Sequence, residues 1–258
     1  MNNKEEDKQA EFDRYDLRAV KILSQEKIAF SATGLSYLPL YLRTPYIFFD
    51  ELLIKKLKPG DRVLEIGAGT GQHTEVLVKS GANVTATDIS GHSLKVLQAR
   101  IMHQLQIDVL VKVADMEKLP FEDGSFDFVV SAGSLSYGDN NIVLNEIYRV
   151  LKQGGSFICV DSLNHNPIYR FNRWVQYLKG KRSISTINRM PTISLLNKYE
   201  SKFEETQVNF FGSLIWLSPI LGLVFGNKNA AFIIDSWDKF IKVYKSAFKF
   251  VMIASKKI

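Results

Sequence analysis

The sequence predicts an α/β fold in which helices cover both faces of a doubly wound, mostly parallel sheet. From Arg62 onward, short apolar runs alternate with helix-like stretches. The apolar runs are continuous and do not alternate with polar residues, as expected for strands that are buried on both faces. Strands that alternate with helices form parallel sheets through right-handed crossovers, which bring the carboxyl ends of the strands to one edge. Ligands bind at that edge, so a site is expected there.

The segment before the first strand is expected to be helical after a flexible start. Residues 1–14 are rich in charged residues and Gln and are expected to be flexible. They lack the apolar region of a secretory signal, so we expect a cytoplasmic protein. Helix-forming residues occupy 15–30, and Thr44 as N-cap with Pro45 at the first helical position predicts a second helix.

One domain is expected over residues 15–258, because 258 residues with 46% hydrophobic content can bury one sizeable core. Its first strands are predicted at 63–66, 84–87, 109–113, 126–130 and 157–160. The helices between them are predicted at 72–79, 92–104 and 141–151. The core comprises 44–161 and 203–258, with a basic, aromatic-rich insertion at 162–202 and an apolar helical insertion at 212–247.

A glycine-rich turn follows the first predicted strand. Residues 63–71 read Val-Leu-Glu-Ile-Gly-Ala-Gly-Thr-Gly, a buried strand that runs directly into three glycines and then a helix. Glycine permits positive φ and lets a ligand approach the backbone closely. The Gly-x-Gly-x-Gly spacing differs from the Gly-x-Gly-x-x-Gly of dinucleotide sites. Because Glu65 stands just before the turn, the site favours a cationic ligand over a phosphate.

Carboxylates follow the next two predicted strands. Asp88 ends the second strand, where its carboxylate can accept hydrogen bonds from both hydroxyls of a ribose; the structural alternative is a helix cap beside Ser90. Asp115 follows the third strand and can accept a hydrogen bond from an exocyclic adenine amine, with Met116 or Ile89 packing on the ring. The two carboxylates therefore predict a ligand that contains a nucleoside.

These segments resemble the class I S-adenosylmethionine-dependent methyltransferases, particularly the broad group that includes quinone and small-molecule methyltransferases. The matching pieces, in the family's order across about residues 62–161, are 65–71, Asp88, Asp115, 119–130 and 146–155. One departure is Gln153, where the family often has proline in a turn of structural importance only. The resemblance implies a seven-stranded sheet with a reversed last strand at 248–255, after a sixth strand near 206–211, and S-adenosyl-L-methionine as the cofactor.

The resemblance also implies roles for the residues of the site. Gly67 and Gly69 would border the methionine part of the cofactor, and Ser131, at the end of the fourth strand, would lie near the sulfonium. The expected cofactor-binding residues are Glu65, Gly67, Ala68, Gly69, Gly71, Asp88, Ile89, Asp115, Met116 and Ser131. We expect no metal ion, and the single cysteine, Cys159, offers no Cys-based zinc site.

His165 and Tyr137 are the candidate catalytic residues. Methyl transfer from a sulfonium is an in-line displacement, so a base is needed only when the nucleophile carries a proton that must leave. His165 comes first, because it follows Asp161, a candidate substrate contact just beyond the fifth strand, and because imidazole exchanges protons near neutral pH. A loop histidine is more often a surface residue. Tyr137 and Asp139, after the fourth strand, are the alternatives.

Positive charge is concentrated in one segment. Residues 162–199 contain seven cations and no Asp or Glu, in a chain whose net charge is +6. Arg170 and Arg173 are expected to hold a phosphate of the acceptor through bidentate contacts. Two alternatives stay open: the segment lies on an anionic membrane, assisted by the apolar stretch 214–225, or it is a solvated helix face. That stretch is shorter than the roughly 20 residues that span a bilayer, so no transmembrane helix is expected.

The sequence thus predicts a methyltransferase that acts on a small-molecule acceptor, with a sugar or lipid-linked intermediate and O-methylation as the leading hypothesis. A quinone- or isoprenoid-type C- or O-methyltransferase at the membrane surface is the alternative. RNA methylation and a catalytically silent cofactor-binding protein are further alternatives. Nucleic acid is not the expected partner, because residues 131–134 read Ser-Ala-Gly-Ser and lack the prolines and aromatic residue of nucleic-acid amino methyltransferases.

Overall fold

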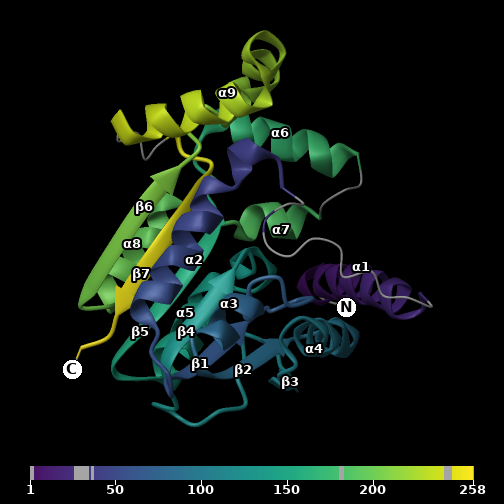
Figure 1. Ribbon diagram of the computed structural model, residues 1–258, viewed down its shortest axis with the longest axis vertical. Helices are drawn as coiled ribbons and strands as arrows, with labels where there is room; N and C mark the ends of the chain where they lie inside the picture. The colour runs from purple at the N-terminus through teal and green to yellow at the C-terminus, as the bar shows by residue number, and fades with distance from the viewer. Residues whose placement is uncertain (1–2, 26–34, 36–37, 180–182, 241–245, 258) are drawn as a thin grey trace.

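The computed structural model describes residues 3–25, 35, 38–179, 183–240 and 246–257. Its centre is a seven-stranded sheet with the strand order β3-β2-β1-β4-β5-β7-β6 (Figure 1). The strands are β1 (Arg62–Ile66), β2 (Asn83–Asp88), β3 (Leu110–Val113), β4 (Phe126–Ala132), β5 (Leu151–Ser162), β6 (Glu205–Phe211) and β7 (Lys249–Ser255). Only β7 is reversed: it pairs antiparallel with β5 and β6, and the pairs among β1 to β5 are parallel. The predicted doubly wound sheet with a reversed last strand is confirmed.

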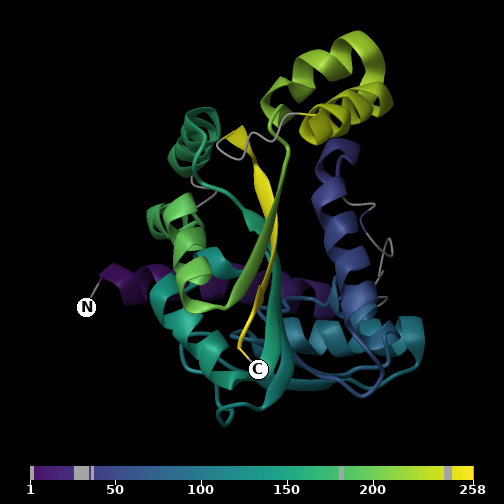
Figure 2. The ribbon, with the colours of Figure 1, turned by 90° about the vertical axis from the view of Figure 1, so that its left-hand side faces the viewer.

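Helices cover both faces of the sheet, as Figure 2 shows from the edge. One face carries α2 (Thr44–Lys56), α3 (Thr74–Lys79) and α4 (Gly91–Leu105), and the other carries α5 (Asn140–Val150) and α8 (Ile193–Lys202). Apolar residues four apart form the buried stripe of each helix, such as Phe49 and Leu53 in α2 and Val143 and Ile147 in α5, all fully buried. Two apolar cores therefore hold the strands rigid on either side.

The start of α2 differs from the prediction by one residue. Thr44 is the first helical residue and not the N-cap, which is Arg43. The Thr44 hydroxyl donates a hydrogen bond to Asp235, 2.8 Å away in α9 (Ser218–Phe240), instead of capping its own helix. A tertiary contact therefore replaces the local cap that the sequence suggested.

The N-terminus is helical within the segment that the sequence analysis expects to be flexible. Helix α1 spans Asn3–Leu23 and packs on α4. The Asp16 carboxylate accepts hydrogen bonds from the Ser90 hydroxyl (2.7 Å) and the His92 ring (3.0 Å) at the start of α4. Burial alone would raise the pKa of Asp16, but these two partners hold it below its usual value. A carboxylate at a helix N-terminus is favourable, which gives α1 a fixed place that composition does not reveal.

Helices α6 (Pro167–Leu178) and α9 of the two insertions lie at one end of the molecule (Figures 1 and 2). The first insertion forms α6, α7 (Ile184–Arg189) and α8, and the second forms the 3-10 turn η4 (Ile215–Leu217) and α9. Tyr169 of α6 donates its hydroxyl to the Gly212 carbonyl at 2.6 Å, which ties the two insertions together. Within the described residues both insertions are mainly helical, as predicted; residues 180–182 and 241–245 of these insertions lie outside the described part of the chain.

Candidate functional site

The turn after β1 holds three glycines at positive φ, and each has a different reason to be glycine. The φ values are +63° at Gly67, +54° at Gly69 and +79° at Gly71. A Cβ on Gly67 would lie 2.4 Å from the Ser134 Cβ, and one on Gly71 would lie 2.7 Å from the Leu97 Cγ. A Cβ on Gly69 would meet nothing within 4 Å, so this glycine leaves open space beside the backbone. A ligand can approach the turn at Gly69.

Glu65 is a buried acid directly before this turn. Its side chain is 2% exposed and accepts a hydrogen bond from the Thr74 hydroxyl at 2.6 Å. Burial raises the pKa of Glu65 to about 7, Thr74 opposes this shift, and the nearby Asp88 adds to it. A buried carboxylate is stable as an anion only beside a cation. Glu65 is therefore suited to an ammonium or other cationic group of a ligand.

Asp88 lies where β2 ends and faces the glycine turn. One carboxylate oxygen accepts the backbone N–H of Gly69 and the other that of Ser90, both at 2.9 Å. Ser90 itself caps α4, because its hydroxyl accepts the Ser93 N–H at 3.0 Å. Burial raises the pKa of Asp88, and the backbone hydrogen bonds oppose this rise. A carboxylate has about four lone-pair sites, so two remain for hydroxyl groups of a ligand.

Asp115 and Met116 follow β3 on the next stretch of the same edge. The Asp115 carboxylate accepts the Glu117 N–H at 3.0 Å, which fixes a turn that presents Met116 to the cavity. Ile89, after β2, is 39% exposed and also lines the cavity. Two apolar side chains beside an acid provide the flat, partly polar surroundings that a purine ring needs.

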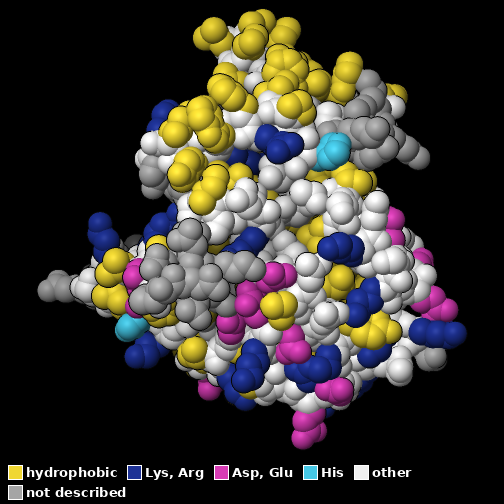
Figure 3. Space-filling view, turned by 180° about the vertical axis from the view of Figure 1, so that it is seen from behind, with side chains coloured by type: hydrophobic (Ala, Val, Ile, Leu, Met, Phe, Trp, Pro, Cys, Tyr) yellow, Lys and Arg dark blue, Asp and Glu magenta, His cyan; other side chains and the backbone are white. Residues whose placement is uncertain are grey.

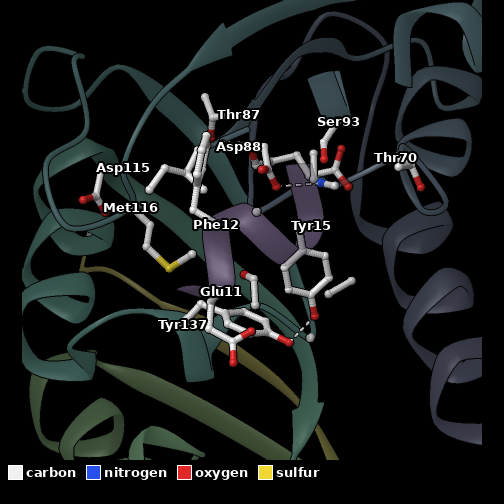
Figure 4. A pocket seen from close by; sticks show the side chains of 18 of the residues that line it. Glu11, Phe12, Tyr15, Thr70, Thr87, Asp88, Ser93, Asp115, Met116 and Tyr137 are labelled. Carbon is white, nitrogen blue, oxygen red and sulfur yellow. Dashed lines mark hydrogen bonds between the residues drawn. The ribbon is translucent and has the colours of Figure 1, made fainter. Parts of the chain in front are cut away.

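These strand ends surround one cavity of about 340 Å³ (Figure 4). Of the ten predicted cofactor-binding residues, the cavity is lined by eight: Glu65, Gly67, Ala68, Gly69, Asp88, Ile89, Asp115 and Met116. Its size is in the range of small-molecule sites. No group of three or more His, Cys, Asp or Glu residues suited to a metal ion occurs in the described part of the chain.

Helix α1 forms a wall of the cavity. In Figure 4 the side chains of Glu11, Phe12 and Tyr15 reach the pocket from this helix, which is drawn in purple. The Tyr15 hydroxyl lies 2.5 Å from that of Tyr137 in the 3-10 turn η3 (Leu135–Tyr137), and the two rings meet edge to face. The Glu11 carboxylate accepts the Thr186 hydroxyl of α7 at 2.9 Å. Both contacts hold α1 across the mouth of the site.

Two predicted cofactor residues stand behind the lining. Ser131 is fully buried and hydrogen bonds to Ser134 at 2.7 Å, and it is Ser134 that lines the cavity. Gly71 packs against Leu97 of α4 and shapes the turn from behind. Ser131, at the end of β4, therefore supports the site indirectly, because it holds the Ser134 side chain that lines the cavity.

Of the predicted catalytic residues, Tyr137 lines the cavity and His165 does not. His165 is exposed in the link between β5 and α6. Of the predicted substrate residues, Asp161 is buried and accepts the Leu135 N–H at 3.0 Å, which positions η3 and hence Tyr137. Burial raises the pKa of Asp161, and Lys249 opposes this shift.

The two predicted phosphate-binding arginines point elsewhere. Arg173 is buried and donates to the Leu163 carbonyl at 2.8 Å and to Asn164 at 3.0 Å, and its guanidinium lies 5.4 Å from the centre of the Phe248 ring. Arg170 is exposed on α6. Neither lines the described cavity, where Arg18 and Arg189 supply positive charge instead.

Several lining residues are not among the predicted site residues, namely Glu11, Phe12, Tyr15, Arg18, Tyr46, Thr186 and Arg189. His73 also lines the cavity, stacked on Tyr46 with ring centres 5.3 Å apart. The sequence carries one signal for these residues: Phe12 and Tyr15, three positions apart, form an aromatic stripe on one face of a helix. What that face covers depends on tertiary packing.

The central part of the chain is similar to a known family and to curated relatives. Residues 64–159 match the sequence model of the family described as "Methyltransferase domain". A demethylmenaquinone methyltransferase of Clavibacter sepedonicus is 38% identical over 117 residues, which cover 43% of this chain and 45% of that protein. The ubiquinone/menaquinone biosynthesis C-methyltransferase UbiE of Brucella abortus is 39% identical over 113 residues, 40% of each chain. The matched part thus spans less than half the length of these relatives.

Solved structures share the fold over nearly the whole chain. Geranyl diphosphate C-methyltransferase from Streptomyces coelicolor, solved with geranyl diphosphate, Mg²⁺ and S-adenosylhomocysteine, aligns with a TM-score of 0.62 and 19% identity, over 97% of this chain and 98% of that one. The [4+2]-cyclase SpnF aligns with a TM-score of 0.60 and 16% identity, over 98% and 96% of the two chains. One fold therefore serves more than one chemistry, and function must be argued from the site.

Proposed function

We propose that this chain, whose residues 64–159 match the family model described as "Methyltransferase domain", is a class I S-adenosylmethionine-dependent methyltransferase that transfers a methyl group to a quinone-type small molecule. The observation that supports binding of this cofactor is the meeting of Glu65, Gly69 and Asp88 around one cavity. A buried acid for an ammonium, an open glycine and a carboxylate for hydroxyls match the parts of S-adenosylmethionine, the cofactor of such domains. The cavity residues therefore fit this cofactor.

The acceptor class rests on the relatives and on the chemistry of the cavity wall. The two relatives described above are a demethylmenaquinone methyltransferase and a ubiquinone/menaquinone C-methyltransferase. Beyond the predicted cofactor residues the lining includes four aromatic side chains among polar and small ones, namely Phe12, Tyr15, Tyr46 and Tyr137. Such a lining suits a flat, aromatic acceptor. The relatives favour this alternative over the leading hypothesis of the sequence analysis, a sugar or lipid-linked acceptor with O-methylation.

The protein's contribution to the reaction is mainly binding and alignment. When bound, the cofactor would supply a methyl group on a sulfonium sulfur. The nucleophile of the acceptor attacks the methyl carbon from the side opposite the sulfur, and the sulfur leaves. Glu65 would neutralise the cationic end of the bound cofactor, and Asp88 would accept hydrogen bonds from its hydroxyls. The Tyr15–Tyr137 pair closes the cavity from the α1 side and limits the entry of water.

A hydroxyl-bearing ring must lose a proton to become a strong carbon nucleophile. One cavity group that can accept that proton is the Glu11 carboxylate, which accepts the Thr186 hydroxyl and forms an ion pair with Arg14. The Tyr137 hydroxyl, bonded to Tyr15, can accept it only as it passes its own proton on to another group. We assign the base to this Glu11–Tyr137 side of the cavity, because both groups stand on the wall away from Glu65 and the glycine turn. Asp161 acts as a positioning residue, since it holds the backbone of η3.

The experiment is a methyl-transfer assay with methyl-labelled cofactor and a panel of acceptors. The panel contains demethylated benzo- and naphthohydroquinones, a sugar nucleotide and an RNA, and mass spectrometry with NMR locates the new methyl group. Labelling of a hydroquinone carbon is the expected result. Labelling of the sugar nucleotide or RNA alone would overturn the acceptor class, and cofactor binding without any transfer would favour a silent or cyclase-like protein.

A further inference from the structure

Helices α6 and α9 expose large apolar side chains that the site does not use. The most exposed are Leu223 at 88%, Phe240 at 87% and Phe232 at 72%. The set that we call the α6–α9 surface consists of Phe171, Trp174 and Leu178 on α6 and Leu223, Val224, Phe232 and Phe240 on α9. Contiguous apolar patches are uncommon on soluble proteins and mark contact with another apolar phase.

Helices α6 and α9 lie at the same end of the molecule and are linked through Tyr169. Tyr169 of α6 donates to the Gly212 carbonyl, and the Trp216 N–H in turn donates to the Tyr169 hydroxyl at 3.3 Å. Both views of the ribbon place α6 and α9 at the same end of the molecule, away from the β3 end of the sheet (Figures 1 and 2). The α6–α9 surface therefore belongs to the two insertions and is distant from β3 at the opposite edge of the sheet.

The exposed charges of these helices are positive. Arg170, Lys228 and Lys239 are exposed, as is Lys179 at the end of α6. The two acids of α9 face the protein: Asp235 accepts the Thr44 hydroxyl, and Asp238 accepts the backbone N–H of Gly212 and of Ser213. Figure 3 shows the α9 end largely hydrophobic, with Asp and Glu gathered in the lower part of that view. The described surface thus combines apolar side chains with cations.

Helix α9 is broken, and neither of its two pieces is long enough to cross a bilayer. The segment 215–240 is long and apolar enough to span a membrane by length and composition, and 17% of its apolar 18-residue stretch is buried. However, Gly226 breaks the helix with φ 76° and ψ 157°. The longer piece, 227–240, is about 21 Å long at 1.5 Å per residue, short of the roughly 30 Å hydrocarbon core. It also begins with exposed Asn227 and Lys228.

We propose that the α6–α9 surface attaches the protein to the surface of an anionic lipid bilayer. The apolar side chains enter the boundary between headgroups and acyl chains, and the exposed Arg and Lys residues contact anionic headgroups. A bilayer is the occupant that this combination fits, because interfacial helices pair an apolar face with cations. Attachment does not depend on the proposed methyl acceptor, so either proposal can fail alone.

The test is co-sedimentation of the full chain with vesicles of phosphatidylcholine, with and without phosphatidylglycerol. We expect binding to the anionic vesicles that weakens as salt is raised. Leu223→Gln with Phe232→Gln should weaken it roughly tenfold or more. Leu110→Gln, a leucine 66% exposed on β3, is the matched control and should bind as the parent does. Arg170→Gln and Lys228→Gln should each cost about fivefold.

Three results would overturn the proposal. The first is no binding of the folded parent chain to anionic vesicles. The second is equal binding by the parent and by Leu223→Gln with Phe232→Gln, checked for folding by circular dichroism. The third is a dimer in analytical ultracentrifugation that the same pair of substitutions dissociates, without vesicle binding, which would assign the surface to a second copy of the chain.

Discussion

The hydroxyls of Tyr15 and Tyr137 lie 2.5 Å apart, although 122 residues separate them in the sequence. Tyr15 belongs to α1 and Tyr137 to η3, so this contact joins the N-terminal helix to the edge of the sheet. Because both residues line the cavity, the contact also determines how closely α1 covers the site.

Tyr15→Phe removes this hydrogen bond and keeps the ring. A neutral hydrogen bond contributes about 1 kcal/mol, so we expect α1 to open more often and cofactor binding to weaken by up to about fivefold. Calorimetric titration with S-adenosylmethionine measures the change. Tyr177→Phe, on exposed α6, is the control; an effect of equal size in both variants would refute the role of α1.

Glu65→Gln should change the pH dependence of stability. The folded pKa of Glu65, about 7, is above its ordinary value, so its contribution to the free energy of unfolding is present below about pH 4.5 and is lost as pH rises through 7. The variant should therefore be more stable than the parent above pH 7, by up to about 3 kcal/mol, and similar at pH 4.5. Urea unfolding without cofactor at both pH values measures the free energy of unfolding of the two chains. The same difference between variant and parent at both pH values would contradict the assigned pKa.

The same substitution should weaken cofactor binding. A cationic ligand favours ionised Glu65, so the parent's affinity should rise with pH up to about 7, by at most about tenfold per pH unit. The Glu65→Gln variant should bind the cofactor weakly, and its affinity should depend little on pH because the amide does not ionise. Titrations at several pH values measure both chains, and parallel curves for the two would show that Glu65 does not face the cation.

The glycines of the turn should separate packing from binding. Gly67→Ala places a Cβ against Ser134 and should destabilise the fold by about 2 kcal/mol or more, whereas Gly69→Ala meets no atom and adds only the strain of positive φ, about 1 kcal/mol. Thermal unfolding measures this order. Gly60→Ala, at φ +91° with open space, is the control for strain and should leave cofactor binding intact, unlike Gly69→Ala.

The sheet and the cofactor edge were predictable because their signals are local. A strand that runs into glycines, such as Leu64 into Gly67, specifies both the turn and the side of the sheet on which it lies. Residues whose role depends on distant partners were not predictable. Asp16 fixes α1 through Ser90 and His92, which lie far away in the sequence. Arg173 has the charge expected of a phosphate ligand, but in the packed structure it donates to the Leu163 carbonyl.

Charge counting likewise located the basic insertion but not the direction of its side chains. One face of α6 points inward with Tyr169 and Arg173, and the other exposes Arg170 with Phe171. Only the packed structure separates a phosphate-binding face from an outward one.

The measurement that tests the central claim most directly is calorimetric titration of S-adenosylmethionine and S-adenosylhomocysteine into the parent chain and into Asp88→Ala. We expect both ligands to bind the parent at one site and to bind Asp88→Ala at least tenfold more weakly, because the variant loses the hydroxyl acceptor and its hold on Gly69. Absence of binding to the folded parent, or unchanged affinity in the folded variant, would contradict the assignment of this cavity to the cofactor.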